Sequence, residues 1–468
     1  MPASAARLSF SQGTLVLTGA RPELVKQIFP DGPWIWDRRV DAWRCDAIWH
    51  DRVRRRLDEA GVAIDDDVAQ WQSVRWPRVD IHPLRDEQQQ AVAAWMKTMR
   101  GCVVMPTGTG KTEVALEIMR RTAGSTLIVA PVRDLMYQWQ RRILAGLGYD
   151  AGIIGDRVYR VRPVSVTTYD SACIHMENLG NQFGLIVFDE CHHLPGPIRR
   201  DAARMSAAPM RLGLTATPER SDGRHVDLKT LIGPIVYELP ISAVKGRTLA
   251  DYEVTRIAVH LSDEERAKYD GYSRQVRAYM AERRKDDPRF SWEDLCSSTG
   301  RSPEARAALG AYYAKKSIED RAEDKLRVLE DLFRLHVGEP CLIFVGSNAM
   351  ARDVSRRFLI PCLLSHCRKQ ERAEILRGLQ EGVYPALVAN RVLDEGVDLP
   401  EVKVAVVIGG LASSRQAKQR LGRILRRSGN ARARLYEIVT ADTGDVQRSR
   451  RRRASDAYEG TRHRRRAK

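Results

Sequence analysis

The sequence predicts an α/β protein with two lobes built on parallel sheets, a small N-terminal α+β domain and a helical insert. Two observations predict this class. Short apolar segments alternate with helical patterns between residues 80 and 240, and the same alternation returns after residue 326. The chain is also 468 residues long, about three times the ~150 residues of a common domain. Its 43% hydrophobic and 29% charged residues are typical of globular proteins and exclude wholesale disorder.

The two alternations are typical of buried parallel strands joined by crossover helices. In the first alternation the apolar segments are residues 102–105, 126–130, 164–167, 185–188 and 212–215. In the second alternation they are residues 341–345, 362–364, 386–389, 404–408 and 435–439. Because each set is a series of short and almost continuous apolar runs, we expect one parallel sheet in each lobe.

The segments outside these alternations have their own character. The N-terminal part is rich in tryptophan and arginine and predicts a small strand-rich module with a helix over residues 51–60. Charged, alanine-rich sequence between residues 262 and 325 predicts a helical insert. The expected parts are an N-terminal domain, a first lobe, an insert with its linker, a second lobe and a disordered basic tail, at residues 1–76, 77–245, 246–325, 326–442 and 443–468.

Four tryptophans of the N-terminal domain, Trp34, Trp36, Trp43 and Trp49, allow two interpretations. In the first, some of them stack on exposed nucleic-acid bases. In the second, they fill the core of a small domain, which is the commoner role because aromatic side chains dominate small cores. The sequence leaves both interpretations open.

The charge balance indicates an anionic partner. The 77 Lys and Arg residues exceed the 60 Asp and Glu residues and give a net charge of +17, which favours nucleic acid. The longest apolar run, residues 404–408, is far shorter than the ~20 residues that cross a bilayer. We therefore expect no membrane partner and a cytoplasmic protein. Eight cysteines without a Cys-x-x-Cys pair favour reduced thiols over a structural zinc site.

A glycine-rich segment, Met105-Pro106-Thr107-Gly108-Thr109-Gly110-Lys111-Thr112, follows a predicted strand and precedes a helical pattern. This context predicts a phosphate-binding loop, because backbone N–H groups and a helix N-terminus can surround phosphate groups. The candidate nucleotide-binding residues are Thr107, Gly108, Thr109, Gly110, Lys111 and Thr112. Lys111 would supply a positive charge, and Thr112 would hold Mg²⁺. A simple glycine-rich turn is the alternative interpretation.

Two adjacent carboxylates, Asp189 and Glu190, follow the predicted strand at residues 185–188. Asp189 would hold Mg²⁺, and Glu190 would polarise the water that attacks a γ-phosphate, so both are catalytic candidates together with Lys111. A solvated turn is one alternative. A soft-metal site at residues 191–193 is another, but no second group of ligands lies at zinc spacing.

Together these motifs resemble the core of superfamily 2 helicases, in which two RecA-like P-loop lobes hydrolyse ATP between them. Leu84-Arg85-Asp86-Glu87-Gln88 resembles the Q motif and implies adenine contacts by Arg85 and Gln88. Asp189-Glu190-Cys191-His192 implies a catalytic role for His192 as well. Thr215-Ala216-Thr217-Pro218 resembles motif III and implies a coupling role for Thr215 and Thr217. The resemblance also implies DNA contacts by Arg133, Thr168, Arg220 and Asp222.

The resemblance continues into the second lobe. Asp394-Glu395-Gly396-Val397-Asp398 resembles motif V and implies nucleotide contacts by Gly396 and Asp398. Gln419-Arg420-Leu421-Gly422-Arg423-Ile424-Leu425-Arg426 resembles motif VI and implies catalytic roles for Gln419, Arg423 and Arg426. Arg423 and Arg426 share one helix face, so both can neutralise charge that develops on the γ-phosphate. Without the other motifs, an arginine-rich helix would instead favour a solvated or nucleic-acid-binding surface.

Within superfamily 2 the sequence most resembles the XPB-type DNA repair helicases, at residues 100–106, 222–225, 231–234 and 392–398. This resemblance implies ATP and Mg²⁺ as cofactors, DNA and a nuclease as partners, 3′ to 5′ polarity and a monomeric motor. It also implies that the N-terminal domain recognises damage and that the insert is thumb-like. The family has an Arg-Glu-Asp motif where this chain has Arg220-Ser221-Asp222, which puts strand separation in doubt. This departure leaves a damage-binding ATPase clamp open as an alternative. An RNA-stimulated helicase also stays open, because motor motifs mostly grip the sugar-phosphate backbone and discriminate DNA from RNA poorly.

Overall fold

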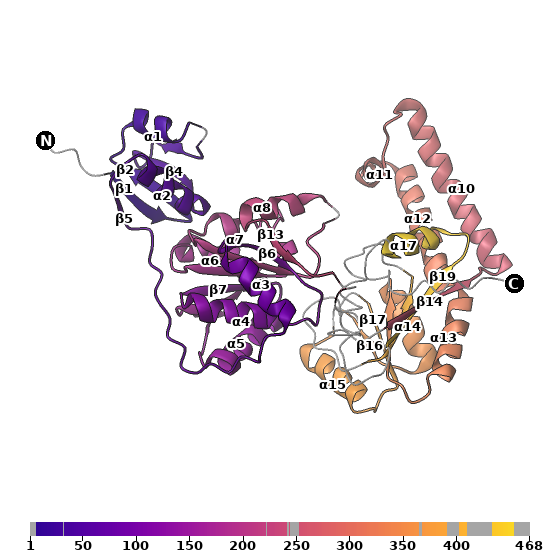
Figure 1. The fold of residues 1–468 in the computed structure, drawn as a ribbon. Helices are drawn as coiled ribbons and strands as arrows, with labels where there is room; N and C mark the ends of the chain where they lie inside the picture. The colour runs from indigo at the N-terminus through magenta and orange to yellow at the C-terminus, as the bar shows by residue number, and fades with distance from the viewer. Residues whose placement is uncertain are drawn as a thin grey trace. The chain divides into compact units, whose positions relative to one another are not determined.

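The structure is a computed structural model that describes residues 6–30, 32–220, 222–240, 243, 252–364, 367–390, 402–409 and 433–453. The chain divides into two compact units, Met1–Pro240 and Ile241–Lys468. Each unit contains a largely parallel sheet flanked by helices (Figure 1), so the predicted α/β class is confirmed. In the described part of the chain, no helix has the length and apolar character that a bilayer crossing needs.

The first unit begins with a small α+β domain. Its sheet has the order β3-β4-β2-β1-β5, with strands β1 (Ala6–Ser11), β2 (Thr14–Thr18), β3 (Ile35–Asp37), β4 (Ala42–Asp46) and β5 (Ile64–Asp66). Helices α1 (Pro22–Ile28) and α2 (His50–Glu59) contribute to its core. Trp34, Trp43 and Trp49 pack against this core, whereas Trp36 is 39% exposed and contacts Trp43 edge-on. Core packing therefore accounts for three of the four tryptophans.

An eight-stranded sheet forms the rest of the first unit, in the order β13-β6-β12-β11-β7-β10-β8-β9. Its strands are β6 (Arg100–Val104), β7 (Thr126–Ala130), β8 (Gly152–Gly155), β9 (Val158–Arg160), β10 (Val164–Thr168), β11 (Leu185–Asp189), β12 (Met210–Thr215) and β13 (Ile235–Glu238). Only β8 and β9 pair in the antiparallel sense among these described strands. The five strands expected from apolar runs are present, and β8, β9 and β13 are additional.

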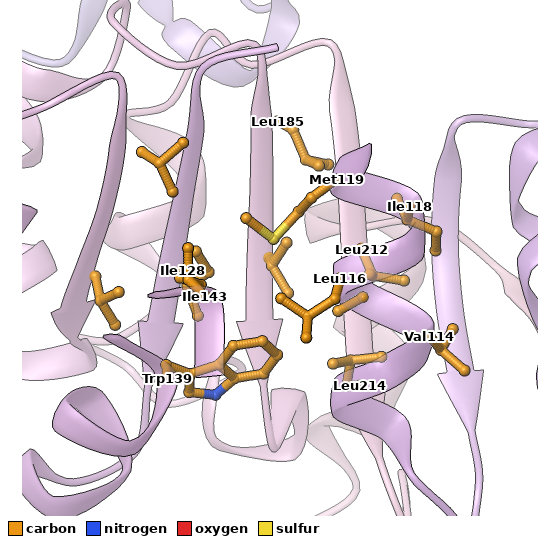
Figure 2. Packing of buried hydrophobic residues seen from close by; sticks show 14 of the residues in the cluster. Val114, Leu116, Ile118, Met119, Ile128, Trp139, Ile143, Leu185, Leu212 and Leu214 are labelled. Carbon is orange, nitrogen blue, oxygen red and sulfur yellow. The ribbon is translucent and has the colours of Figure 1, made fainter. Parts of the chain in front are cut away.

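Helices cover both faces of this sheet, because side chains of a strand alternate between its two faces. One core lies beneath α3 (Asp86–Met96), α4 (Lys111–Thr122) and α5 (Arg133–Leu147). Figure 2 shows Leu116 and Met119 of α4 directed towards Ile128, Leu185 and Leu212 of the sheet. The opposite core lies beneath α6 (Tyr169–Leu179), α7 (Asp201–Arg204) and α8 (Leu228–Leu231).

The second unit contains a six-stranded parallel sheet in the order β14-β19-β18-β15-β17-β16. Its strands are β14 (Tyr252–Val259), β15 (Cys341–Val345), β16 (Cys362–Leu363), β17 (Ala386–Ala389), β18 (Val404–Ile408) and β19 (Ala433–Thr440). Helices α13 (Glu323–Leu335) and α14 (Asn348–Phe358) contribute to its core, and α15 (Lys369–Gln380) precedes β17. Strand β14 lies within the segment that the sequence assigned to insert and linker.

Three helices form the insert, α10 (Asp263–Asp286), α11 (Trp292–Ser298) and α12 (Pro303–Arg321). Helices α10 and α12 pack side by side, and Figure 1 shows the three as a group projecting from the second sheet. Leu295 of α11 packs with Ala305 and Ala308 of α12 in a small core of their own. The helical character expected between residues 262 and 325 is therefore present.

Helix α17 (Gly444–Arg453) begins where the sequence analysis expected a disordered tail, and that expectation is wrong for these ten residues. Asp445 is fully buried and accepts a 2.8 Å hydrogen bond from the fully buried Lys325 of α13. Arg448 forms ion pairs with Glu319 and Asp320 at the end of α12. The sequence did not predict this helix, because the residues that dock it are charged and lie in a run of arginines that is typical of a disordered tail.

This docking predicts a difference between two truncations. Removing residues 444–468 leaves Lys325 buried without Asp445, and breaking a buried ion pair costs about 3–5 kcal/mol. Because that cost corresponds to roughly 10 °C in a unit of this size, calorimetry should show a lower melting temperature for the second unit. Removing residues 454–468 should leave the melting temperature unchanged. Equal melting temperatures for both truncations would contradict the docking role of α17.

Candidate nucleotide site in the first unit

The glycine-rich loop at residues 105–110, called the P-loop below, joins the end of β6 to the start of α4. Gly108 and Gly110 have φ angles of 86° and 82°, in the left-handed region that favours glycine. A Cβ atom on Gly110 would lie 2.3 Å from Nε2 of Gln88. The loop therefore needs glycine at position 110 for both its backbone conformation and its close contact with α3.

Arg85 and Gln88 hold the P-loop from the side of α3. Gln88 is buried and donates a 2.9 Å hydrogen bond from Nε2 to the Thr109 carbonyl, and Arg85 donates to the same oxygen at 2.6 Å. The Gln88 Oε1 atom accepts from the Arg85 backbone N–H at 2.9 Å. These contacts order the loop backbone. The adenine contacts implied for Arg85 and Gln88 stay a prediction.

Several P-loop side chains fit an anionic ligand. The buried Thr107 hydroxyl has no hydrogen-bond partner among the described residues, so it is available to a phosphate oxygen. Lys111 donates a 3.1 Å hydrogen bond to the Met105 carbonyl, which keeps its ammonium group at the loop. Its positive charge also lowers the pKa of Asp189, although other influences on that carboxyl prevail. The structure thus brings Lys111 and Asp189, two predicted catalytic residues from distant segments, into one site.

Asp189 lies at the end of β11 and is held by two donors. Its Oδ2 atom accepts a 2.8 Å hydrogen bond from the Trp139 indole, and its Oδ1 atom accepts from the Glu190 backbone N–H at 3.0 Å. Burial, followed by the negative charge of Glu190, raises the pKa of Asp189 to about 6. Sequence analysis missed Trp139, because an apolar residue on an amphipathic helix signals only core packing.

A hydrogen-bonded chain connects the carboxylates to motif III. Glu190 has a φ of 47°, and its Oε2 atom lies 3.4 Å from both the Thr215 hydroxyl and Nδ1 of His192. His192 is fully buried, with Nδ1 3.0 Å from the Thr215 hydroxyl. The Thr217 backbone N–H donates to the same hydroxyl at 3.1 Å. The predicted catalytic and coupling residues are therefore in direct contact.

The series of hydrogen bonds continues to residues 220–222, the segment that departs from the Arg-Glu-Asp motif. Arg220 donates a 2.6 Å hydrogen bond to the His192 carbonyl and pairs with Asp222 through two hydrogen bonds of 2.9 and 2.6 Å. Hydrogen bonding to Arg220 holds the pKa of Asp222 well below its usual range. Ser221, between them, lies outside the described residues. Two of the four predicted DNA-contacting residues are thus linked to the nucleotide site through His192.

The other two predicted DNA-contacting residues occupy neighbouring strand ends. Arg133 follows β7, its side chain is 70% exposed, and it pairs with Asp156 at 2.8 Å. Thr168 ends β10, is buried, and caps α6 by accepting a hydrogen bond from the Ser171 backbone N–H at 3.3 Å. The structure thus gives Thr168 a capping role.

The remaining predicted residues lie outside the described residues: Gly396, Asp398, Gln419, Arg423 and Arg426. On the soft-metal alternative, the described residues contain no group of three or more His, Cys, Asp or Glu side chains that could hold a metal ion. Cys191 is fully buried against Cys102 in the core. A hydrogen bond with Cys102, together with burial, holds the pKa of the Cys191 thiol well above its usual range.

Comparison with known proteins agrees with this geometry. Three family models match the chain: the xeroderma pigmentosum group B helicase damage recognition domain at residues 8–68, the res subunit of type III restriction enzymes at 81–220, and the helicase conserved C-terminal domain at 324–428. A solved structure of the Pyrococcus furiosus Hef helicase domain superposes with a TM-score of 0.54 at 16% identity, covering 77% of this chain and 97% of that one. This likeness supports a fold of two RecA-like lobes.

Curated relatives agree as well. The DNA 3′-5′ translocase XPB2 of Sulfurisphaera tokodaii is 39% identical over 89% of this chain and 95% of its own length. The DNA 3′-5′ helicase XPB of Kineococcus radiotolerans is 32% identical over 77% of this chain, and the aligned part covers 60% of that protein. With matches of this extent along both units, and with the nucleotide site assembled at the ends of β6, β11 and β12, the chain belongs to the XPB family of helicases.

Proposed function

We propose that this protein is an ATP-driven DNA translocase and helicase of the XPB type, moving 3′ to 5′ and acting in DNA repair. The chain of hydrogen bonds from Glu190 through Thr215 and His192 to Arg220 is the observation that carries this proposal. It joins a carboxylate of the nucleotide site to Arg220, one of the residues predicted to form the DNA surface. A nucleotide-driven shift of Glu190 would therefore reach that surface through contacts already made.

The residues of the P-loop fit ATP, and those at the end of β11 fit Mg²⁺. Thr107, Lys111 and the backbone N–H groups of the loop would bind the phosphates, and Thr112 and Asp189 would hold Mg²⁺. A bound Mg²⁺ ion neutralises phosphate charge and offsets the cost of ionising a buried Asp189. Glu190 would orient and deprotonate the attacking water.

The second lobe completes the proposed mechanism. Gly396 and Asp398 would contact the nucleotide, and Gln419, Arg423 and Arg426 would stabilise the charge on the γ-phosphate. We propose that the motor works as a monomer and that a nuclease is a partner, as the family resemblance implies. The net charge of +17 supports DNA as the other partner, because phosphate contacts by Lys and Arg dominate nucleic-acid affinity.

Trp139 is proposed to position Asp189 for Mg²⁺. Trp139→Phe removes the indole N–H and keeps an aromatic ring, so the Mg²⁺ concentration for half-maximal ATP hydrolysis should rise about tenfold, as for other outer partners of metal ligands. A Mg²⁺ titration at saturating ATP measures this shift, and maximal turnover should be largely recovered at high Mg²⁺. A variant with an unchanged Mg²⁺ requirement would exclude this role.

ATP hydrolysis measured with different nucleic acids tests the proposed function. The protein is assayed alone and with single-stranded DNA, duplex DNA, a fork with a 3′ tail and single-stranded RNA, at one fixed salt concentration. We expect strong stimulation by DNA and unwinding of the 3′-tailed fork. Preferential stimulation by RNA would favour the RNA-stimulated helicase, and the absence of any stimulation would overturn the proposal.

One feature favours a second candidate, a damage-binding clamp whose ATPase separates few strands. Ser221 replaces the acidic residue of the family motif, between Arg220 and Asp222. If this departure limits strand separation, Ser221→Glu should increase the rate of fork unwinding while DNA affinity stays constant. Unwinding assays under single-turnover conditions, with DNA affinity as the control, would reject this explanation if the rate does not rise.

A further inference from the structure

The hairpin formed by β8 and β9 has a surface that packing does not explain. Strand β9 lies at the edge of the eight-stranded sheet, and its three side chains are all exposed. Val158 is 40% exposed and Tyr159 is 57% exposed. An edge strand without a buried side chain contributes backbone pairing and little to the core. Its side chains are therefore exposed and accessible to a ligand.

The tip of the hairpin is fixed in place. Asp156 and Arg157 have φ angles of 53° and 63°, which is the left-handed conformation that a two-residue hairpin turn requires. The Asp156 carboxylate pairs with Arg133 at 2.8 Å and accepts a 3.1 Å hydrogen bond from the Tyr137 hydroxyl. Both partners belong to the first turns of α5, so the tip is attached to the segment that carries Arg133.

The tip of the hairpin lies at the same edge of the sheet as the carboxyl ends of β7 and β10. Strands β7, β10 and β8 are parallel neighbours, and the carboxyl ends of parallel strands meet at one edge of a sheet. Arg133 follows the first of these strands, Thr168 ends the second, and Arg157 follows the third by two residues. At Gly155 an added Cβ would lie 2.7 Å from the Ser171 hydroxyl of α6, so hairpin and helix are in close contact.

The hairpin also presents an exposed cation and a largely exposed aromatic ring. Among the described residues, no carboxylate pairs with Arg157, whereas the nearby Arg160 pairs with Asp150 at 3.4 Å. The ring of Tyr159 contacts His175 with 4.9 Å between centroids and is otherwise exposed. A free guanidinium group attracts a phosphate, and an exposed aromatic ring stacks on a base.

We propose that this hairpin binds one strand of the DNA, with Arg157 contacting a backbone phosphate and Tyr159 stacking on an adjacent base. The inference rests on the proposed function and extends the DNA surface by one strand of the sheet, beyond the contacts that the family resemblance implies for Arg133 and Thr168. It assigns binding rather than hydrolysis to the hairpin, because Arg157 lies in the turn between β8 and β9, Tyr159 lies on β9, and the nucleotide site lies at the ends of β6, β11 and β12.

Three variants test the hairpin. Arg157→Gln removes the free charge, Tyr159→Ala removes the ring, and Arg160→Gln is the matched control because its guanidinium group is already paired. Binding of a fluorescent single-stranded DNA is measured at several salt concentrations without nucleotide. Arg157→Gln should weaken binding about fivefold and reduce the slope of log affinity against log salt by about 0.7. Tyr159→Ala should weaken binding about tenfold with the slope unchanged.

Two further readouts separate this inference from the proposed function. Tyr159→Phe should restore the affinity lost in Tyr159→Ala, and ATP hydrolysis without DNA should match that of the unaltered protein in all variants. If Arg157→Gln behaves like Arg160→Gln in a protein whose hydrolysis DNA stimulates, the hairpin inference is wrong and the proposed function stands. If DNA neither binds nor stimulates the unaltered protein, the proposed function itself fails.

Discussion

Lys111→Ala should abolish ATP hydrolysis and leave DNA binding intact. The ammonium group of Lys111 is held at the P-loop by the Met105 carbonyl, so its removal takes away the positive charge that would meet the β- and γ-phosphates. Loss of one preorganised charged contact in such a site costs at least ~10²-fold in turnover. The DNA surface proposed above is separate from this lysine. Steady-state hydrolysis and DNA binding, measured on the same preparation, check both halves of the prediction.

Lys97→Ala is a matched control for that experiment. Lys97 is exposed at the end of α3, and its removal lowers the net charge equally without touching the P-loop. Hydrolysis and DNA affinity of Lys97→Ala should both stay near those of the unaltered protein. Turnover retained by Lys111→Ala would refute the nucleotide site. DNA binding lost by Lys111→Ala would indicate that the P-loop and the DNA surface overlap.

Glu190→Gln should prevent hydrolysis without preventing ATP binding. A glutamine keeps the size of the side chain and its contact with Thr215, but it cannot accept the proton of the attacking water. Removal of a general base lowers turnover by about 10²–10⁴-fold. Equilibrium binding of a fluorescent ATP analogue should be unchanged or tighter, because one negative charge beside Asp189, which would repel the phosphates, is gone.

The carboxylate Glu117 provides a control on the same lobe. It pairs with Arg120 and Arg121 within α4, so Glu117→Gln removes a charge that has no part in hydrolysis. Its turnover should remain close to that of the unaltered protein. A similar loss of turnover in both glutamine variants would show that general destabilisation of the lobe, not the loss of a base, explains the effect of Glu190→Gln.

Much of the fold could be predicted because the strands of the parallel sheets are buried on both faces. Such strands appear in sequence as continuous apolar runs, and β7 and β15 have the predicted bounds. Strands β9 and β14 could not be found in this way, since β9 exposes all three side chains and β14 is an edge strand. Their sequences mix polar and apolar residues, and their position depends on pairing with strands distant in the chain.

In the candidate site, too, residues in local motifs were predictable and their distant partners were not. Lys111, Asp189 and Glu190 were predictable because local motifs place them after strands, and the structure brings Lys111 and Asp189 together. The residues that hold these side chains in place were not predictable. Trp139, for example, donates to Asp189 from 50 positions away in the sequence and belongs to no local motif. Gln88 was assigned to adenine on resemblance, and only the structure shows its hydrogen bond to the P-loop backbone.

The pairing of β14 with β19 has a consequence for how the protein is made. Every residue from Tyr252 to Val259 pairs with a partner between Ala433 and Thr440. Strand β14 therefore stays unpaired until a segment much later in the chain has been synthesised. At translation rates of about 5–20 residues per second, that wait is on the order of ten seconds or more. The first unit, by contrast, is complete once residue 240 leaves the ribosome. A nascent chain would therefore carry a complete first unit and an unpaired strand together, and an unpaired strand edge of this kind is prone to aggregation.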